Sequence, residues 1–207
     1  MPCMIGIDLD NTLINYDQAF YGSALAAAWI DKDIAMSKTD VRDAVRRLHE
    51  GEAKWQALQA KVYGPDIGLA QPMPGALDFL RHMAQRNLSC CVISHKTRFA
   101  AAQTDSCDLH EAALSWLEQQ GFFKTDHSGL SRNHVFFCET RAQKLAQIRA
   151  MECRYFIDDL LEVFAEPEFP AAVEKICLTQ AVNVLLPGVK TFSDWRNIRE
   201  YVATRAG

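Results

Sequence analysis

Two carboxylates lie two positions apart near the start of the sequence, at Asp8 and Asp10 within residues 8–12 (Asp-Leu-Asp-Asn-Thr). The short apolar run at residues 4–7 precedes them, and such a run followed by acidic and turn-forming residues predicts a buried strand that leads into a loop. In an open parallel sheet, ligands and catalytic groups collect beyond the carboxyl ends of the strands. Crowded carboxylates repel one another, and a hard divalent cation such as Mg²⁺ would relieve that repulsion while leaving oxygens for a phosphate. The sequence therefore predicts a metal site at this loop.

A calcium-binding loop is an alternative explanation for the same acidic stretch. In that pattern Leu13 would replace the required glycine and Ala19 would replace the closing glutamate. A predicted strand, rather than a helix, also precedes the stretch. These departures count against the calcium loop.

Three further features follow along the chain. Ser94 closes the apolar run at residues 91–93, Lys144 lies in a predicted helix, and Asp158 and Asp159 follow the apolar residues 155–157. Each has a simpler explanation when it is taken alone: a turn serine, a solvated lysine, and a helix N-cap with a second acid in the first turn. Their joint occurrence after the Asp-x-Asp-x-Thr stretch favours a catalytic set instead.

In their order and spacing, these four features resemble the motifs of the haloacid dehalogenase-like (HAD) superfamily, over residues from about 3 to 180. The resemblance implies an α/β fold, a Rossmann-like three-layer parallel sheet with an inserted helical cap. It also implies a Mg²⁺-dependent phosphatase that hydrolyses a small phosphomonoester through an aspartyl-phosphate intermediate.

The resemblance also implies a role for each residue. Asp8 would be the nucleophile, and Asp10 would protonate the leaving oxygen and later accept a proton from water. Ser94 and Lys144 would bind phosphoryl oxygens. The expected metal ligands are Asp8, the backbone carbonyl of Asp10, Asp158 and Asp159, with Asp159 also ordering Lys144. The expected substrate contacts are Asn11, Thr12, His95, Lys96 and Arg98, of which Lys96 and Arg98 could equally face solvent.

Asp10 favours phosphate chemistry over carbon–halogen cleavage, because the dehalogenase branch of the superfamily lacks an aspartate at that position. Several alternatives stay open: a phosphomutase, a phosphoprotein phosphatase on the same scaffold, or a non-catalytic phosphate-binding module. A cap over the site would disfavour macromolecular substrates.

The elements that must position these residues follow from the hydrophobic pattern. Residues 16–70 read as the helical cap, with helices over 17–29, after Ser37 and around 52–63, while residues 1–15 and 71–207 form the core. Helices that alternate with short apolar strands predict a parallel sheet covered on both faces. The expected core helices are 76–85, 109–120, 141–151 and 193–204, and the expected strands are 4–7, 90–93, 135–137, 155–157, 175–178 and 182–185. The loop at 98–108 is long enough for a role in substrate selection.

Composition fits a compact enzyme and excludes some other classes. With 207 residues, of which 49% are hydrophobic, the chain can bury a full core. The net charge of −4 argues against a nucleic-acid partner. Seven cysteines without Cys-x-x-Cys spacing predict buried, reduced thiols, and no long apolar segment suggests a membrane partner or secretion. We therefore expect a cytoplasmic protein that acts on a small phosphorylated metabolite; its oligomeric state stays open.

Overall fold

The chain forms two compact units in a computed structural model that describes residues 3–100, 107–124, 129–180 and 186–206. The first unit comprises Met1–Leu13, Pro72–Lys96 and Leu117–Gly207, and the second comprises Ile14–Gln71 and Thr97–Trp116. The predicted division into a core and a cap at residues 16–70 remains a prediction. The second unit also contains residues 97–116, which the sequence assigned to the core.

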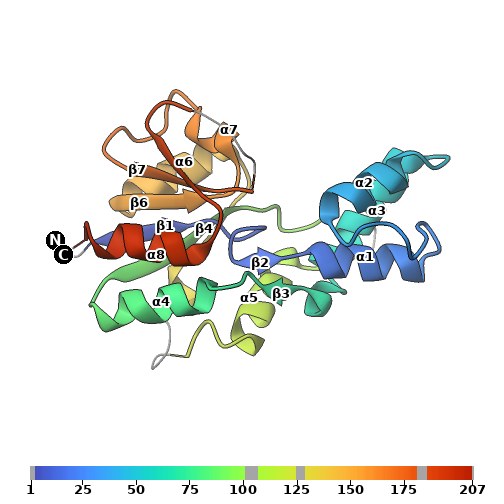
Figure 1. Ribbon diagram of the computed structural model, residues 1–207, viewed down its shortest axis with the longest axis horizontal. Helices are drawn as coiled ribbons and strands as arrows, with labels where there is room; N and C mark the ends of the chain where they lie inside the picture. The colour runs from blue at the N-terminus through green and yellow to red at the C-terminus, as the bar shows by residue number, and fades with distance from the viewer. Residues whose placement is uncertain (1–2, 101–106, 125–128, 181–185, 207) are drawn as a thin grey trace. The chain divides into compact units, whose positions relative to one another are not determined.

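A six-stranded parallel sheet forms the centre of the first unit, with the strand order β5-β4-β1-β6-β7-β8 (Figure 1). The strands are β1 (Met4–Ile7), β4 (Ser89–His95), β5 (Val135–Cys138), β6 (Cys153–Asp158), β7 (Glu174–Leu178) and β8 (Val189–Phe192). From β1 the chain builds outward to β4 and β5, then crosses to β6 on the other side of β1. The strand order therefore reverses next to β1, where open α/β sheets place their ligands.

Helices cover both faces of this sheet, which gives the three layers predicted from the sequence (Figure 1). On one face, α4 (Ala76–Gln85) and α8 (Trp195–Ala203) pack together through the rings of Phe79 and Trp195, whose centroids are 4.8 Å apart. On the other face, α6 (Arg141–Ala150) and the short α7 (Leu161–Phe164) pack on a buried cluster that includes Ile148 and Phe156. Both faces of the central strands β1, β4 and β6 are thus largely buried, as their nearly continuous apolar sequences predict.

Gly6 allows the central strand to pass beneath two neighbouring side chains. It pairs with Cys91 of β4 on one side and with Phe156 of β6 on the other. A Cβ atom at Gly6 would lie 2.6 Å from Phe156 Cδ2 and 2.8 Å from Cys153 Sγ. The thiol and the ring therefore fill the space that a side chain at residue 6 would need.

Gly6→Ala is expected to destabilise the protein by about 1–3 kcal/mol, because the core must shift to accept the methyl group. Gly22→Ala is the matched control. Gly22 lies inside α1 (Asp17–Ala26), and a Cβ atom at this residue would have no neighbour within 4 Å, so alanine should stabilise the helix by about 0.5–1 kcal/mol. Urea unfolding of both variants measures the difference, and equal effects would contradict this account of Gly6.

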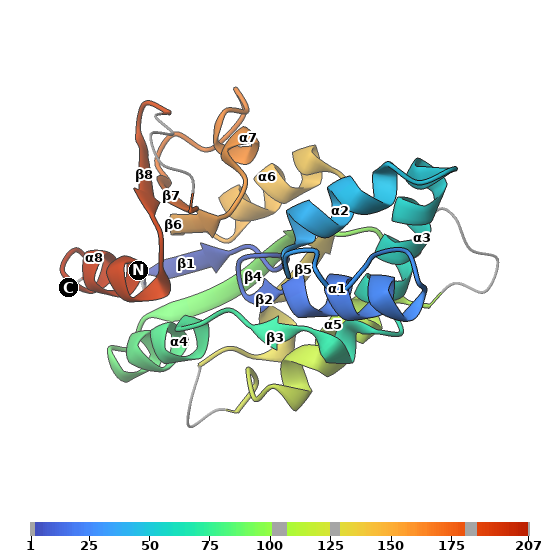
Figure 2. The ribbon, with the colours of Figure 1, turned by 45° about the vertical axis from the view of Figure 1, so that its right-hand side comes forward.

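The second unit is mainly helical. Its elements are α1 (Asp17–Ala26), α2 (Lys38–Arg46), α3 (Gly51–Tyr63), η1 (Ile67–Leu69) and the first part of α5 (Leu109–Gln119). Helices α1, α2 and α3 pack against one another (Figure 2), and the rings of Phe20 and Trp55 stack with their centroids 4.9 Å apart. The Trp116 indole N–H donates to the Ala70 carbonyl at 3.2 Å, which joins residues 97–116 to this unit. The short strands β2 (Ile14–Asn15) and β3 (Gln71–Pro72) pair with each other at the two ends of the segment Ile14–Gln71.

Most of the predicted elements are confirmed, often to within a few residues. As predicted, Ser37 begins α2, and its hydroxyl accepts a hydrogen bond from the Asp40 backbone N–H. Strand β8 was not predicted, whereas the strand predicted at residues 182–185 and residues 101–106 of the predicted loop lie outside the described residues. All seven cysteines are free, with Cys3 and Cys107 partly exposed. In the described part of the chain, no helix is both long and apolar enough to cross a bilayer.

Candidate active site

The loop after β1 places Asp8 and Asp10 at the carboxyl edge of the sheet. The backbone N–H of Asp8 donates to the Ile157 carbonyl at 2.8 Å, which extends the pairing of β1 with β6 by one residue. The loop then turns back, with the Leu13 N–H donating to the Leu9 carbonyl at 2.9 Å. Asn11 has φ of 59°, in the left-handed region that asparagine adopts more readily than most residues. Asp8 is thus held rigidly by a central strand.

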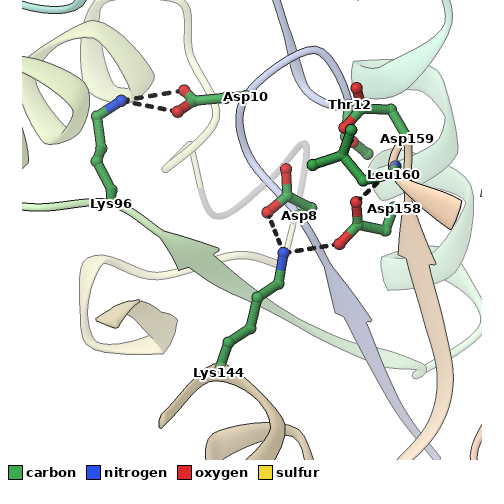
Figure 3. Close-up of polar contacts among 8 residues, drawn as sticks. All are labelled: Asp8, Asp10, Thr12, Lys96, Lys144, Asp158, Asp159 and Leu160. Atoms are coloured by element: carbon green, nitrogen blue, oxygen red, sulfur yellow. Dashed lines mark hydrogen bonds and ion pairs between the residues drawn. The ribbon is translucent and has the colours of Figure 1, made fainter. Parts of the chain in front are cut away.

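Lys144 extends from the first turn of α6 to the two buried acids of the site. A capping box between Thr140 and Gln143 fixes the start of this helix. The Lys144 ammonium donates to Asp8 Oδ1 at 2.6 Å and to Asp158 Oδ2 at 2.7 Å (Figure 3). All three side chains are buried. The helix and the two strands β1 and β6 therefore bring together residues that lie far apart in the sequence.

Burial dominates the electrostatics of this cluster. It raises the pKa of the Asp8 carboxyl well above its usual range, against the lowering effect of Lys144, and the nearby Asp158 and Asp10 carboxylates raise it further. Burial alone would lower the pKa of the Lys144 ammonium, but Asp8 and Asp158 together raise it above its ordinary value. The site therefore favours the charged form of Lys144, and the negative charge on Asp8 is costly in the absence of another cation.

The donor set fits a hard divalent cation. Carboxylate oxygens of Asp8, Asp158 and Asp159 lie within 4.8 Å of one another. Three carboxylates face one ammonium, so two negative charges are uncompensated when all are ionised, and a divalent cation would balance them. Oxygen ligands are those that Mg²⁺ prefers. The Asp10 carboxylate does not belong to this group of three, and the predicted contribution of its backbone carbonyl stays a prediction.

Further hydrogen bonds fix Asp158, Asp159 and the loop after β1. Asp158 Oδ1 accepts from the Leu160 backbone N–H at 2.9 Å, and the Thr12 hydroxyl lies 3.5 Å from Asp159 Oδ1. The Trp195 indole N–H donates to the Thr12 carbonyl at 3.0 Å, which ties the loop to α8. Two supports of the site were not predicted from the sequence. The capping box had a readable signal in its Thr-x-x-Gln spacing, whereas the contact of Trp195 over 183 positions had none.

The other predicted site residues have different surroundings. Ser94 is buried near the carboxyl end of β4, two residues beyond Val92, the neighbour of Ile7 in the sheet. His95 is exposed, and its Nε2 lies 3.1 Å from the Glu139 carbonyl oxygen. Arg98 belongs to the second unit, where its guanidinium pairs with Asp108 at 2.8 Å. The predicted roles of all three in binding phosphate or substrate stay predictions.

Lys96 is buried rather than exposed to solvent. Its ammonium donates to both oxygens of Asp10, at 3.1 Å and 2.9 Å (Figure 3). Each carboxylate of the Asp-x-Asp pair thus has an ammonium partner within the first unit, Lys144 for Asp8 and Lys96 for Asp10.

Comparisons with known proteins find matches to the fold of this chain but none to its sequence. No protein-family model matches the chain, and no curated protein sequence matches it. Solved structures do match. A HAD family hydrolase from Deinococcus radiodurans with bound phosphate and sodium has a TM-score of 0.60 at 11% identity, over 98% of this chain and 96% of that one. A predicted phosphoglycolate phosphatase from Haemophilus somnus has a TM-score of 0.52 at 13% identity, over 96% and 97% of the two chains.

The same fold also occurs in a protein with a different named activity. The Protein Tyrosine Kinase A of Mycobacterium tuberculosis has a TM-score of 0.62 at 13% identity, over 97% of this chain and 98% of that one. The chain therefore has the fold of the HAD-superfamily hydrolases, which confirms the fold that its motifs predicted. The chemistry must be argued from the site itself.

Proposed function

We propose that this protein is a Mg²⁺-dependent phosphatase of the HAD type, which hydrolyses a small phosphomonoester through an aspartyl-phosphate. The observation that carries the proposal is the buried group of Asp8, Asp158 and Lys144 at the carboxyl edge of the sheet, with Asp159 beside it. An ammonium and paired carboxylates at the carboxyl edge of a parallel sheet suit phosphoryl transfer. This reaction depends mainly on positioning the reacting groups and on neutralising the charge of the phosphoryl oxygens. The fold neighbours named as a phosphatase and as a phosphate-bound hydrolase support the same class.

In this mechanism Asp8 attacks phosphorus and the bond to the leaving oxygen breaks. Figure 3 shows the second Asp8 oxygen turned away from Lys144, while Oδ1 receives the ammonium. Asp10 gives a proton to the leaving oxygen, so the alcohol departs neutral. Asp10 then takes a proton from water as the water oxygen attacks phosphorus, which releases phosphate and restores the Asp8 carboxylate. Ser94 and Lys144 hold the non-reacting phosphoryl oxygens.

Asp8, Asp158, Asp159 and the backbone carbonyl of Asp10 would hold Mg²⁺. When bound, the ion would supply positive charge that offsets the repulsion between the Asp8 carboxylate and the phosphate dianion. The Lys144 ammonium contributes to the same neutralisation, since it already contacts Asp8 Oδ1 at 2.6 Å.

Excess chelator is expected to stop phosphate release, and added Mg²⁺ to restore it. Ca²⁺ should restore little activity, because its longer bonds and looser coordination would misplace Asp8 relative to phosphorus. A chelated sample that keeps full activity would contradict the metal requirement. Thermal melting gives a second readout, since a cation that binds only the folded site raises the melting temperature.

The decisive experiment measures free phosphate released from a panel of phosphorylated metabolites and phosphopeptides in the presence of Mg²⁺. Phosphate release from small metabolites supports the proposal. Transfer of the phosphoryl group to a second sugar hydroxyl without free phosphate would instead indicate a mutase, and preferential hydrolysis of phosphopeptides would indicate a phosphoprotein phosphatase. No reaction with any compound would favour a binding module.

A further inference from the structure

Lys96 is the second buried lysine at this edge of the sheet, and the mechanism above gives it no task. It follows the last residue of β4, and its backbone N–H donates to the Cys138 carbonyl at 3.0 Å, which extends the pairing of β4 with β5. The residue is 5% exposed. Because its base is fixed by the sheet and its stem is buried, its ammonium has little freedom of position.

The contact with Asp10 constrains the carboxylate in two ways. One nitrogen lies 3.1 Å from Oδ1 and 2.9 Å from Oδ2, so rotation of the carboxylate about its last bond is opposed. The Asp10 side chain is 22% exposed, whereas that of Lys96 is 4% exposed, so the lysine anchors a partner that reaches toward solvent. A hydrogen bond between charged partners is stronger than one between neutral groups.

The two lysines also direct the two carboxylates to different places. Asp8 and Asp10 are separated by one residue, and their like charges would repel within a shared space. Figure 3 shows Asp8 directed to Lys144 and Asp10 directed to Lys96, with the two ammonium groups apart. The nucleophile and the proton carrier are thus held as separate groups.

We propose that Lys96 is a positioning residue that holds the Asp10 carboxylate where it exchanges protons with the leaving oxygen and with water, and that it does not bind the phosphoryl group. This inference rests on the proposed phosphatase function. Proton transfer requires the donor oxygen within hydrogen-bond reach of its target, and a displacement of about 1 Å can cost about 100-fold in rate. Loss of Lys96 should therefore slow the formation of the aspartyl-phosphate only for substrates whose leaving oxygen needs the proton.

The test compares kcat/KM of Lys96→Met on two substrates, because kcat/KM reports the steps up to formation of the aspartyl-phosphate. The leaving group of an alkyl phosphate is a strongly basic alkoxide, whose oxygen must be protonated as it departs. The leaving group of 2,4-dinitrophenyl phosphate is a weakly basic phenolate, which departs readily without a proton. We expect a loss of about 100-fold for the alkyl phosphate and less than about 5-fold for the dinitrophenyl ester. Lys96→Arg, which keeps the charge, should recover part of the alkyl activity.

Two further variants separate positioning from other effects. Asp10→Asn should show the same dependence on the leaving group, and adding Lys96→Met to it should cost little more, since Lys96 acts through Asp10. Lys190→Met is the matched control, because Lys190 is an exposed lysine of β8 in the same unit, and it should leave both substrates unaffected. Thermal melting establishes that each variant is folded. If Lys96→Met is not folded, Lys96→Arg replaces it in the test, and its kcat/KM must fall more for the alkyl phosphate than for the dinitrophenyl ester.

Several outcomes would overturn the inference while leaving the phosphatase intact. An equal loss on both substrates would mean that Lys96 binds the phosphoryl group or only supports the fold. Unchanged kinetics, or additive losses in the double variant, would mean that Asp10 is positioned without it. If the wild-type protein with Mg²⁺ released no phosphate from either compound, the proposed function would fail and the inference with it.

Discussion

Asp8→Asn is expected to reduce phosphate release by at least about 10⁴-fold, because it removes the nucleophile of the proposed mechanism. The amide keeps the shape of the carboxylate but is a poor nucleophile, and it also removes one negative charge from the cluster of Asp8, Asp158 and Asp159. The measurement is single-turnover hydrolysis of the best substrate at saturating Mg²⁺.

The fold should survive this change. Burial raises the pKa of the Asp8 carboxyl, which means that the ionised form is disfavoured inside the protein. A neutral amide avoids that cost, and Lys144 keeps its contact with Asp158 at 2.7 Å. We therefore expect the melting temperature to be unchanged or higher. Asp78→Asn is the control, because Asp78 is an exposed acid of α4 that pairs with Arg81, and this variant should keep full activity. A folded Asp8→Asn protein with substantial turnover would exclude the covalent mechanism.

Lys144→Met should abolish activity and also destabilise the protein, by about 3–5 kcal/mol in the presence of chelator. The ammonium is buried and contacts two buried carboxylates, at 2.6 Å and 2.7 Å. Without it, Asp8 and Asp158 lose their shared cation, and breaking a buried ion pair from one side costs far more than deleting an exposed one. Urea unfolding and phosphate release measure the two effects.

The effect of Mg²⁺ on the melting temperature tests the role of Lys144 more specifically than the loss of stability does. The variant presents one more uncompensated negative charge than the wild type, so the cation should raise its melting temperature by more than it raises that of the wild type. Lys175→Met serves as a control: its ammonium donates to the Phe164 carbonyl rather than to a carboxylate of the cluster, so Mg²⁺ should affect this variant as it affects the wild type. An equal response to Mg²⁺ in Lys144→Met and wild type would contradict the idea that the ion and Lys144 share the same carboxylates.

The sequence predicted the central strands of the sheet well because these strands are largely buried on both faces. Residues 4–7, 90–93 and 155–157 are apolar runs with clear ends, and their order along the chain is enough to suggest a parallel sheet. β8 escaped prediction since its sequence Val-Lys-Thr-Phe is short and mixed, as suits a strand at the edge of the sheet. The hydrophobic pattern of these four residues does not distinguish a strand from a loop.

The site was predictable to the extent that it depends on strand ends. Asp8, Ser94 and Asp158 each follow or close an apolar strand, so the sheet alone places them at one edge. Lys96 shows the limit of this reasoning. Its position after β4 suggested either a substrate contact or a charge that faces solvent, but the partner that fixes it lies 86 residues away, and no local pattern encodes that pairing. Likewise, nothing in residues 97–116 indicates that Trp116 bonds to the Ala70 carbonyl.

The two separate segments of the second unit also set an order for folding during synthesis. That unit has all its residues once Trp116 has left the ribosome, whereas β1 must wait for its neighbour β6, which ends at Asp158. Among the strands of the sheet, β1 therefore waits through the longest stretch of synthesis for its second partner, and until then its unpaired backbone edge has only β4 beside it on the other side. When Trp116 has left the ribosome, the second unit has all its residues, whereas only β1 and β4 of the six strands of the sheet have emerged, and both still lack a neighbour on one edge.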